Sequence, residues 1–173
     1  YVFEGKAITI PMAYGRMDNK IILHGSNANR MLTTLLKAGE MSMTVMHLDA
    51  LVLARSGFHH SVNYRSATLF GSVKKIEEKD AKDKALFVFM EHMMKGRWDG
   101  IREMNQAEFD RTLTIEMTIE TASAKIRDVG VADEPDDYNL DVWAGLVPIK
   151  QVAEYPIPDE GKPQQMEIPK HVL

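Results

Sequence analysis

The clearest alternation of hydrophobic and polar residues runs from Thr112 to Glu120. Every second position is hydrophobic and the positions between are threonine or glutamate: Leu113, Ile115, Met117 and Ile119 against Thr114, Glu116, Thr118 and Glu120. Successive side chains of a strand point to opposite faces of its sheet. The pattern therefore predicts an antiparallel strand with one buried face and one solvated face.

Other strands are predicted from their apolar and β-branched composition. Residues 6–13 form the first, where Pro11 favours a sheet edge or a bulge because it lacks a backbone N–H. A turn over 15–19 leads to a returning strand over 20–24. Three later strands are expected over 41–54, over 64–73 with a bulge at Gly71, and over 142–147.

Apolar residues at helical spacing predict two helices. The first has Asn27 as its N-cap and Gly39 just beyond its end, and its apolar face is made by Met31, Leu32, Leu35 and Leu36. The second spans 79–93, with an apolar stripe of Ala81, Ala85, Leu86, Phe89 and Met93. The acidic segment 133–137 is expected to be a surface loop, and the proline-rich tail after Tyr155 to wrap across a surface or be disordered.

These elements follow one another as β-β-α-β-β-α-β-β. Hairpin-linked strands with helices inserted between them indicate an antiparallel barrel or an α+β sandwich. The order lacks the strand–helix alternation of a doubly wound parallel sheet, and the chain has no Gly-x-Gly-x-x-Gly motif. With 173 residues, the chain has the length of one domain.

Composition narrows the classes of chemistry and partner. The chain has no cysteine, which excludes disulfides, thiolate metal sites and cysteine nucleophiles. A net charge of −4 argues against nucleic-acid binding, and no apolar stretch approaches the roughly 20 residues that cross a bilayer. We therefore expect a cytoplasmic protein without membrane or nucleic-acid partners. Tyr1 begins directly in strand-like sequence without an initiating Met, as if a leading segment had been lost.

The segment from His24 to Arg30 leaves a strand and enters a helix. Free backbone N–H groups at such a turn favour an anion. Gly25 allows close backbone approach, Ser26 adds a hydroxyl and Arg30 adds a guanidinium. An ordinary capped helix with a solvent-facing arginine explains the same residues. Spacing alone therefore leaves phosphate binding and helix capping both open.

Further polar residues begin the predicted fourth strand, over Asn63–Ser66. They fit either a site at one end of a barrel or the rim of an interface. His59 and His60, with His47 and Asp49 nearby, suggest a metal site. Adjacent residues of a strand point to opposite faces, however, so no metal site is expected. The serines are not in a Gly-x-Ser-x-Gly elbow, which argues against a serine hydrolase.

Five stretches of the sequence together resemble the flavin-binding split-barrel proteins. They are Ile10–Tyr14, Leu23–Ser26 with Arg30, Ala54–Ser66 running on to Phe70–Gly71, Ser123–Arg127, and Val142–Pro148. The chain is most similar to the pyridoxamine 5′-phosphate oxidase-related branch, which includes the nitroimidazole-resistance proteins. The resemblance implies a mainly β fold with inserted helices, a six-stranded antiparallel split β-barrel. Residues 1–150 would form this domain and residues 151–173 a C-terminal extension.

The same resemblance implies that FMN lies at the subunit interface of a homodimer. It places the first strand beside the isoalloxazine, the turn after the second strand at the phosphate, and later residues near the ring. The expected cofactor-binding residues are Thr9, Pro11, Met12, Ala13, His24, Gly25, Ser26, Asn29, Arg30, Asn63, Tyr64, Arg65, Ser66, Lys125 and Trp143. Many relatives carry Gly-Arg-Lys at Asn29–Met31, so one positive charge is missing beside the phosphate.

The resemblance defines the activity of the chain less closely than it defines the cofactor. Residues that would recognise a pyridoxamine phosphate substrate are not identifiable, so that activity is not expected. The leading expectation is an FMN-dependent oxidoreductase acting on a small organic molecule, with its catalytic residues and substrate unassigned. His24 is interpreted first as a structural hydrogen-bonding residue at a strand end. The alternatives are a non-catalytic flavin carrier or sensor, and the same fold holding haem or a deazaflavin.

Overall fold

A computed structural model describes residues 1–159, 161 and 167–173 of the chain. Its strands are β1 (Val2–Phe3), β2 (Lys6–Ala7), β3 (Gly15–Met17), β4 (Lys20–Ser26), β5 (Glu40–Leu53), β6 (Ser61–Lys75), β7 (Thr112–Arg127) and β8 (Gly145–Pro148). Its α-helices are α1 (Arg30–Ala38), α2 (Lys79–Met93) and α3 (Gln106–Arg111). Short 3₁₀ turns lie at Trp98–Gly100, Pro135–Asn139 and Lys170–Val172. None of the helices described is long and apolar enough to cross a membrane.

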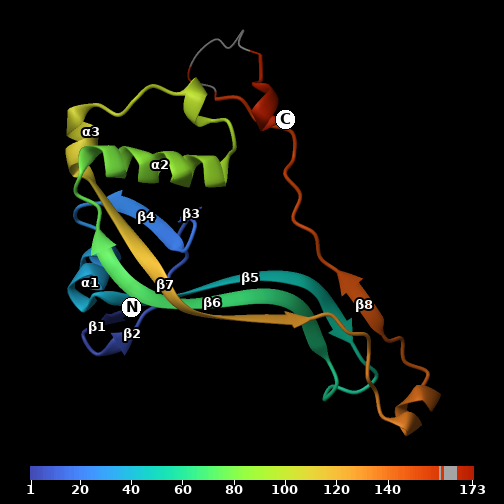
Figure 1. The fold of residues 1–173 in the computed structure, drawn as a ribbon. Helices are drawn as coiled ribbons and strands as arrows, with labels where there is room; N and C mark the ends of the chain where they lie inside the picture. The colour runs from blue at the N-terminus through green and yellow to red at the C-terminus, as the bar shows by residue number, and fades with distance from the viewer. Residues whose placement is uncertain (160, 162–166) are drawn as a thin grey trace. The chain divides into compact units, whose positions relative to one another are not determined.

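The strands form one six-stranded sheet and one small hairpin (Figure 1). The sheet order is β3-β4-β7-β6-β5-β8, and β1 pairs with β2. The β3–β4, β4–β7 and β5–β8 pairs are antiparallel. The predicted mainly β architecture with inserted helices is therefore confirmed.

The chain divides into two compact units, which are described separately below. The first unit contains residues 1–42, 70–121 and 154–173. The second contains residues 43–69 and 122–153.

The first unit contains the main hydrophobic core. Ile21, Ile22 and Leu23 are consecutive in β4 and all buried, so both faces of this strand are covered. Helix α2 packs against β3 and β4, as Figure 1 shows. The remaining core side chains come from two helices and two strands: Met31, Leu32 and Leu35 of α1, Ala85, Leu86 and Phe89 of α2, Val73 of β6, and Leu113, Ile115 and Met117 of β7.

The predicted strand over 6–13 is wrong. Only Lys6–Ala7 is a strand, and residues 8–14 belong to no strand. Pro11 has no N–H to donate to a ladder. The Ile8 N–H bonds to the Tyr1 carbonyl at 2.8 Å, and residues 9–14 make no backbone hydrogen bond to any described residue. The hairpin partner of β4 is instead β3, which occupies part of the predicted turn.

The two predicted helices form, with local corrections. Helix α1 begins at Arg30, and its N-cap is Asn29 rather than Asn27. Gly39 ends it as predicted, with a φ of 73° that side chains rarely adopt. In α2, Ala81 and Met93 are exposed, and Lys82 is buried instead. Its ammonium donates to the Phe109 carbonyl at 2.5 Å, and burial lowers its pKa.

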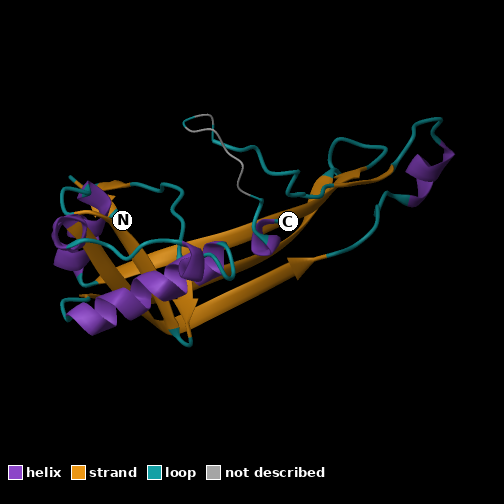
Figure 2. Cartoon of the chain, turned by 90° about the horizontal axis from the view of Figure 1, so that it is seen from above, coloured by secondary structure: helices purple, strands orange, loops and turns teal. Residues whose placement is uncertain are grey.

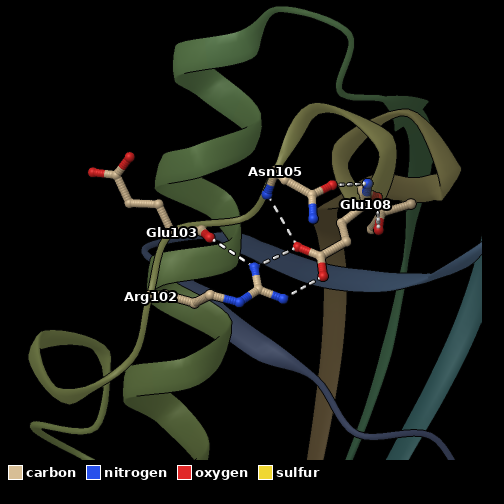
Figure 3. A network of polar contacts seen from close by, with 5 residues as sticks. Arg102, Glu103, Asn105 and Glu108 are labelled. Atoms are coloured by element: carbon tan, nitrogen blue, oxygen red, sulfur yellow. Dashed lines mark hydrogen bonds and ion pairs between the residues drawn. The ribbon is translucent and has the colours of Figure 1, made fainter.

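The short helix α3, which the sequence pattern did not predict, is held by a capping box (Figure 3). The Asn105 side chain accepts from the Glu108 N–H at 3.0 Å, and the Glu108 carboxylate accepts from the Asn105 N–H at 3.0 Å. Arg102 also donates to that carboxylate at 2.7 Å. The Arg102 and Asn105 hydrogen bonds lower the pKa of Glu108 to about 2.

The second unit has few buried residues. Its strands include most of β5 and β6, the end of β7, and β8, which pairs Leu53 with Gly145 and Ala50 with Pro148. The predicted last strand is shifted, because it begins at Gly145 and not at Val142. Figure 2 shows the 3₁₀ turn Pro135–Asn139, drawn as a short helix between two loops, in the segment expected to be an acidic loop.

The tail after Tyr155 is described only in part, because residues 160 and 162–166 lie outside the described residues. In the described part, His171 lies beside Gly96 of the first unit: a β-carbon added at Gly96 would be 3.4 Å from the His171 Cβ.

The close approach of β6 to β7 at Gly71 gives a test of the first unit. A β-carbon at Gly71 would overlap the backbone carbonyl of Thr118, which cannot move without disturbing the sheet. Gly71→Ala should lower the free energy of unfolding by about 1–3 kcal/mol, measured by urea denaturation. Gly57→Ala is the matched control, because nothing lies within 4 Å of a β-carbon there. Equal losses for the two variants would contradict the steric role of Gly71.

Candidate functional site

The turn between β4 and α1 is fixed to the start of β7. Ser26 is the last residue of β4 and pairs with Thr112. The next residue, Asn27, donates its backbone N–H to the Arg111 carbonyl at 3.1 Å. Its side-chain amide donates to the Asp110 carbonyl at 2.6 Å. The start of α1 is therefore held by hydrogen bonds to the segment that precedes β7.

Capping accounts for part of this turn. Asn29 accepts a hydrogen bond from the Leu32 N–H at 3.1 Å, and the Ser26 hydroxyl accepts one from the Ala28 N–H at 3.2 Å. Within the described part of the chain, the N–H groups of Arg30 and Met31 have no acceptor. A donating hydroxyl proton on Ser26 and two free amides thus remain at the positive end of the helix dipole.

Arg30 lies at the same helix end. Its guanidinium carbon is 4.6 Å from the centre of the Phe3 ring in the β1–β2 hairpin. Among the described residues, no carboxylate pairs with it. The aromatic ring restricts the guanidinium while leaving its N–H groups for an external anion.

His24 and Gly25, the first residues of the predicted phosphate turn, pack inward. The His24 ring meets Phe89 edge-on at 4.3 Å, and its Nδ1 is buried without a partner among the described residues. Burial lowers the pKa of His24, so the ring stays neutral at pH 7. A β-carbon on Gly25 would lie 3.1 Å from Leu32 Cδ1, so Gly25 serves the packing of α1 on β4.

The residues expected beside the isoalloxazine lie outside regular structure. Thr9, Pro11 and Ala13 are exposed and Met12 is half-buried, in the segment between β2 and β3. No hydrogen bond involves their side chains among the described residues. Their contact with a flavin ring stays a prediction.

In the second unit, Asn63 joins β6 to the chain that follows β7. Its side chain is 2% exposed. Its amide nitrogen donates to the Val129 carbonyl at 2.9 Å, and its oxygen accepts from Arg127 at 2.8 Å and from the Val129 N–H at 3.3 Å. Three bonds within the chain leave Asn63 one free N–H. We therefore assign it first a role in holding the segment after β7.

The other expected residues of the second unit are more accessible. Arg65 forms a two-point ion pair with Asp49, at 2.9 and 3.0 Å. The Lys125 ammonium lies 5.8 Å from the centre of the Tyr64 ring and pairs with no carboxylate of the described chain. Ser66 is half-buried. These residues can present one cation and one aromatic ring to a ligand.

Trp143 is 68% exposed and precedes β8. Its ring lies against Gly145, where a β-carbon would be 2.9 Å from the indole. It is therefore not a core residue of this chain. An exposed indole of this size is typical of a ligand contact or a subunit interface.

Sequence reasoning missed a buried ion pair in the second unit. The Asp133 side chain is fully enclosed, although the segment 133–137 was expected to be a surface loop. Burial raises its pKa, but hydrogen bonds from Arg55, at 3.0 Å from the N–H and 2.9 Å from the guanidinium, outweigh burial and hold the pKa below its ordinary value. The Arg55 guanidinium also lies over the Tyr138 ring at 4.9 Å.

The first unit also has a cavity of about 330 Å³ beside α2 and α3. It is lined by Lys79, Asp83, Trp98, Glu103, Met104, Gln106 and Phe109, none of which was expected in the site. No group of three or more metal-ligating side chains occurs within the described residues.

The Asn63 network gives a test that separates a structural role from a ligand contact. Asn63→Ala should lower the free energy of unfolding by about 1–3 kcal/mol, because it removes the three hydrogen bonds that the buried Asn63 side chain makes to Val129 and Arg127. Arg65→Ala is the control, since its exposed ion pair should contribute little to stability. Urea denaturation of the ligand-free protein measures both. Loss of ligand affinity without loss of stability in Asn63→Ala would contradict the structural assignment.

Comparison with known proteins identifies the family of this chain. Residues 1–126 match the family model described as pyridoxamine 5′-phosphate oxidase. No curated protein sequence matches the chain. Two similar solved structures are the flavocytochrome Anf3 from Azotobacter vinelandii and the FAD and haem binding protein from Mycobacterium smegmatis.

Both structures cover nearly the whole chain. The flavocytochrome is 29% identical to this chain with a TM-score of 0.90, and the alignment covers 99% of this chain and 79% of the flavocytochrome chain. The FAD and haem binding protein is 29% identical with a TM-score of 0.92, and the alignment covers 99% of this chain and 84% of that protein's chain. A proposed 5-nitroimidazole antibiotic resistance protein from Bacteroides thetaiotaomicron shares the fold at 20% identity, with a TM-score of 0.59 and coverage of 70% and 69%. The chain thus belongs to the pyridoxamine 5′-phosphate oxidase family, a flavin-binding family with the split-barrel fold.

Proposed function

We propose that this chain binds a flavin nucleotide and acts as a flavin-dependent oxidoreductase on a small organic molecule. The observation that carries the proposal is the start of α1, where the Arg30 and Met31 amides and the Arg30 guanidinium have no acceptor within the described chain. Such an arrangement suits the dianionic phosphate of a flavin nucleotide. Family membership supports the same ligand.

FMN is the expected nucleotide, and FAD is its rival. The two share the isoalloxazine ring, the ribityl chain and the first phosphate, which is the group that the α1 turn would hold. The relative from Mycobacterium smegmatis is named for FAD. Extraction of the bound flavin and its separation by chromatography distinguishes the two.

The residues of this chain would bind and position the flavin, which itself supplies the redox chemistry. Ser26 and Arg30 would hold the phosphate, and Met12 and its neighbours would flank the ring. Lys125 would add a positive charge, and the exposed ring of Trp143 would exclude water. His24 is half-buried, and burial lowers its pKa and favours the neutral ring, so it is not proposed as an acid or base. A flavin carrier or sensor without turnover is the alternative, and a cytoplasmic location remains a prediction.

We further propose that the protein is a homodimer, formed through the second unit. In this unit, all of whose residues are described, only Ala50, Val52, Ala54 and Asn63 are buried. Its exposed large apolar side chains are Met46, Leu48, Phe58, Ile126, Val129, Tyr138, Leu140, Val142, Trp143, Leu146, Val147 and Val152. So much exposed apolar surface is typical of a protein–protein interface. We take the partner to be a second copy of the chain, because most soluble oligomers are symmetric homo-oligomers.

Haem is a second candidate ligand, beside the flavin. The specific observation is that two similar structures, with TM-scores of 0.90 and 0.92, are named for it, one as a flavocytochrome and the other as an FAD and haem binding protein. A haem iron takes one or two axial ligands from the protein, and imidazole is a common one. The chain contains six histidines that could serve. No observation favours a deazaflavin.

The phosphate assignment predicts a selective loss of affinity. Arg30→Ala should weaken FMN binding by about 1.5–3 kcal/mol, the range for a hydrogen bond to a charged group, as measured by fluorescence titration of the apoprotein. Riboflavin, which lacks the phosphate, should bind parent and variant equally. Lys37→Ala removes a cation from the last turn of α1 and should change neither affinity. Equal FMN affinity in Arg30→Ala and the parent would remove Arg30 from the site.

The dimer is tested by mass in solution. Sedimentation at micromolar concentration should give twice the chain mass of 19.6 kDa, consistent with an interface above about 1,000 Å². Leu146→Glu places a charge on β8 among the exposed apolar residues and should favour the monomer. Lys150→Glu, an exposed polar position just after β8, should leave the dimer intact. A flavin-bound parent of monomer mass would refute the dimer.

A further inference from the structure

The C-terminal end of α3 is capped by donors from two other elements. The last four carbonyls of a helix have no partner within the helix. Here the Phe109 carbonyl accepts a hydrogen bond from the Lys82 ammonium of α2 at 2.5 Å. The next two carbonyls, of Asp110 and Arg111, accept from the Asn27 side chain and N–H at 2.6 and 3.1 Å. The residue that begins the turn into α1 therefore also caps α3.

Lys82 is a costly residue to place at this position. It lies in the first turn of α2, beside α3 (Figure 1). Its side chain is 7% exposed, and no carboxylate of the described residues pairs with its ammonium. Burying a charge without an opposite charge costs free energy, whereas a methionine would fill the space without that cost. What the ammonium adds is a fixed position for Phe109, through its carbonyl and through its ring, whose centre is 3.8 Å from Nζ.

Asn27 connects this end of α3 to the turn that is proposed to hold the phosphate. It does not cap α1, because Asn29 does. Its side chain is exposed and bonds only to α3 within the described chain. Two residues separate it from Arg30, and the turn between them is closed by a hydrogen bond from the Asn29 N–H to the Ser26 carbonyl at 2.9 Å. The position of α3 therefore sets the position of the Arg30 amide.

Open amides bind an anion tightly only when the protein holds them in place beforehand, because ordering them during binding costs free energy. The contacts that order this turn come from α3 and, through α3, from α2. The other end of α3 is held by its capping box (Figure 3). The short helix is thus fixed at both ends, as a support for the turn must be.

We propose that Lys82 and Asn27 are positioning residues for the phosphate of the flavin nucleotide, acting through the C-terminal end of α3. This inference rests on the flavin binding proposed above. Neither side chain is assigned a contact with the phosphate itself, because the Lys82 ammonium is buried and the Asn27 amide faces the Asp110 carbonyl.

The test measures the affinity of the full chain for FMN and for riboflavin, by fluorescence titration of the apoprotein. Lys82→Met and Asn27→Ala should each weaken FMN binding by about fivefold or more, the effect of one lost hydrogen bond, and leave riboflavin binding unchanged. Lys84→Met is the matched control in α2, because Lys84 is exposed and makes no side-chain hydrogen bond or ion pair within the described chain. It should change neither affinity.

Asn27→Ala separates positioning from a purely structural role. Its hydrogen bond is exposed, so water replaces it in the variant, and the midpoint of urea denaturation should stay that of the parent. The double variant Lys82→Met with Asn27→Ala should lose less FMN affinity than the product of the two single losses, because both residues act through one segment. If Lys82→Met does not fold, the FMN and riboflavin affinities of Asn27→Ala decide the question alone.

Equal losses of FMN and riboflavin affinity in Asn27→Ala, or no loss of either, would overturn the positioning role. Arg30→Ala distinguishes this failure from that of the phosphate site. If Arg30→Ala loses FMN affinity while Asn27→Ala and Lys82→Met keep it, the phosphate binds at the turn and only the positioning role is wrong. If Arg30→Ala binds FMN as the parent does, the phosphate site itself is wrong, and the positioning role with it.

Discussion

The pairing of β4 with β7 is the interaction on which the rest of the first unit depends. The register runs from Lys20 opposite Thr118 to Ser26 opposite Thr112, and the apolar side chains of both strands form the centre of the core. Gly71 lets β6 approach the β7 backbone at Thr118. Because the pairing ends at Ser26, and Asn27 continues it by bonding to Arg111, the ladder also fixes where α1 begins.

The start of α1 shows how a structural turn can leave donors for a ligand. Ser26 accepts from the Ala28 N–H and Asn29 from the Leu32 N–H, and the Arg30 and Met31 amides between them have no acceptor among the described residues. Phe3 restricts the guanidinium of Arg30 without neutralising its charge. Capping and anion binding, which the spacing left as alternatives, are therefore compatible, since each uses different N–H groups of one helix terminus.

The second unit is organised by polar contacts more than by a core. Asn63 holds the segment after β7, and the pair formed by Arg55 and Asp133 holds the next part of it. Polar contacts of this kind specify the path of the chain but supply little hydrophobic stabilisation. The exposed apolar side chains of the unit, Trp143 and Phe58 among them, then remain for a second copy or for a cofactor.

The sequence by itself determined the elements whose residues follow a local period. The alternation along β7, the helical spacing of α2 and the glycine after α1 were enough, because each depends on the backbone geometry of a few neighbouring residues. The resemblance of five motifs to a family gave the fold class.

Tertiary structure decided the rest. The segment 6–13 has strand-like composition but no partner strand beyond Ala7, and Lys82 is buried because Phe109 lies where its ammonium can reach. The burial of Asp133 and the free donors at Arg30 depend on residues distant in sequence, which no local pattern encodes.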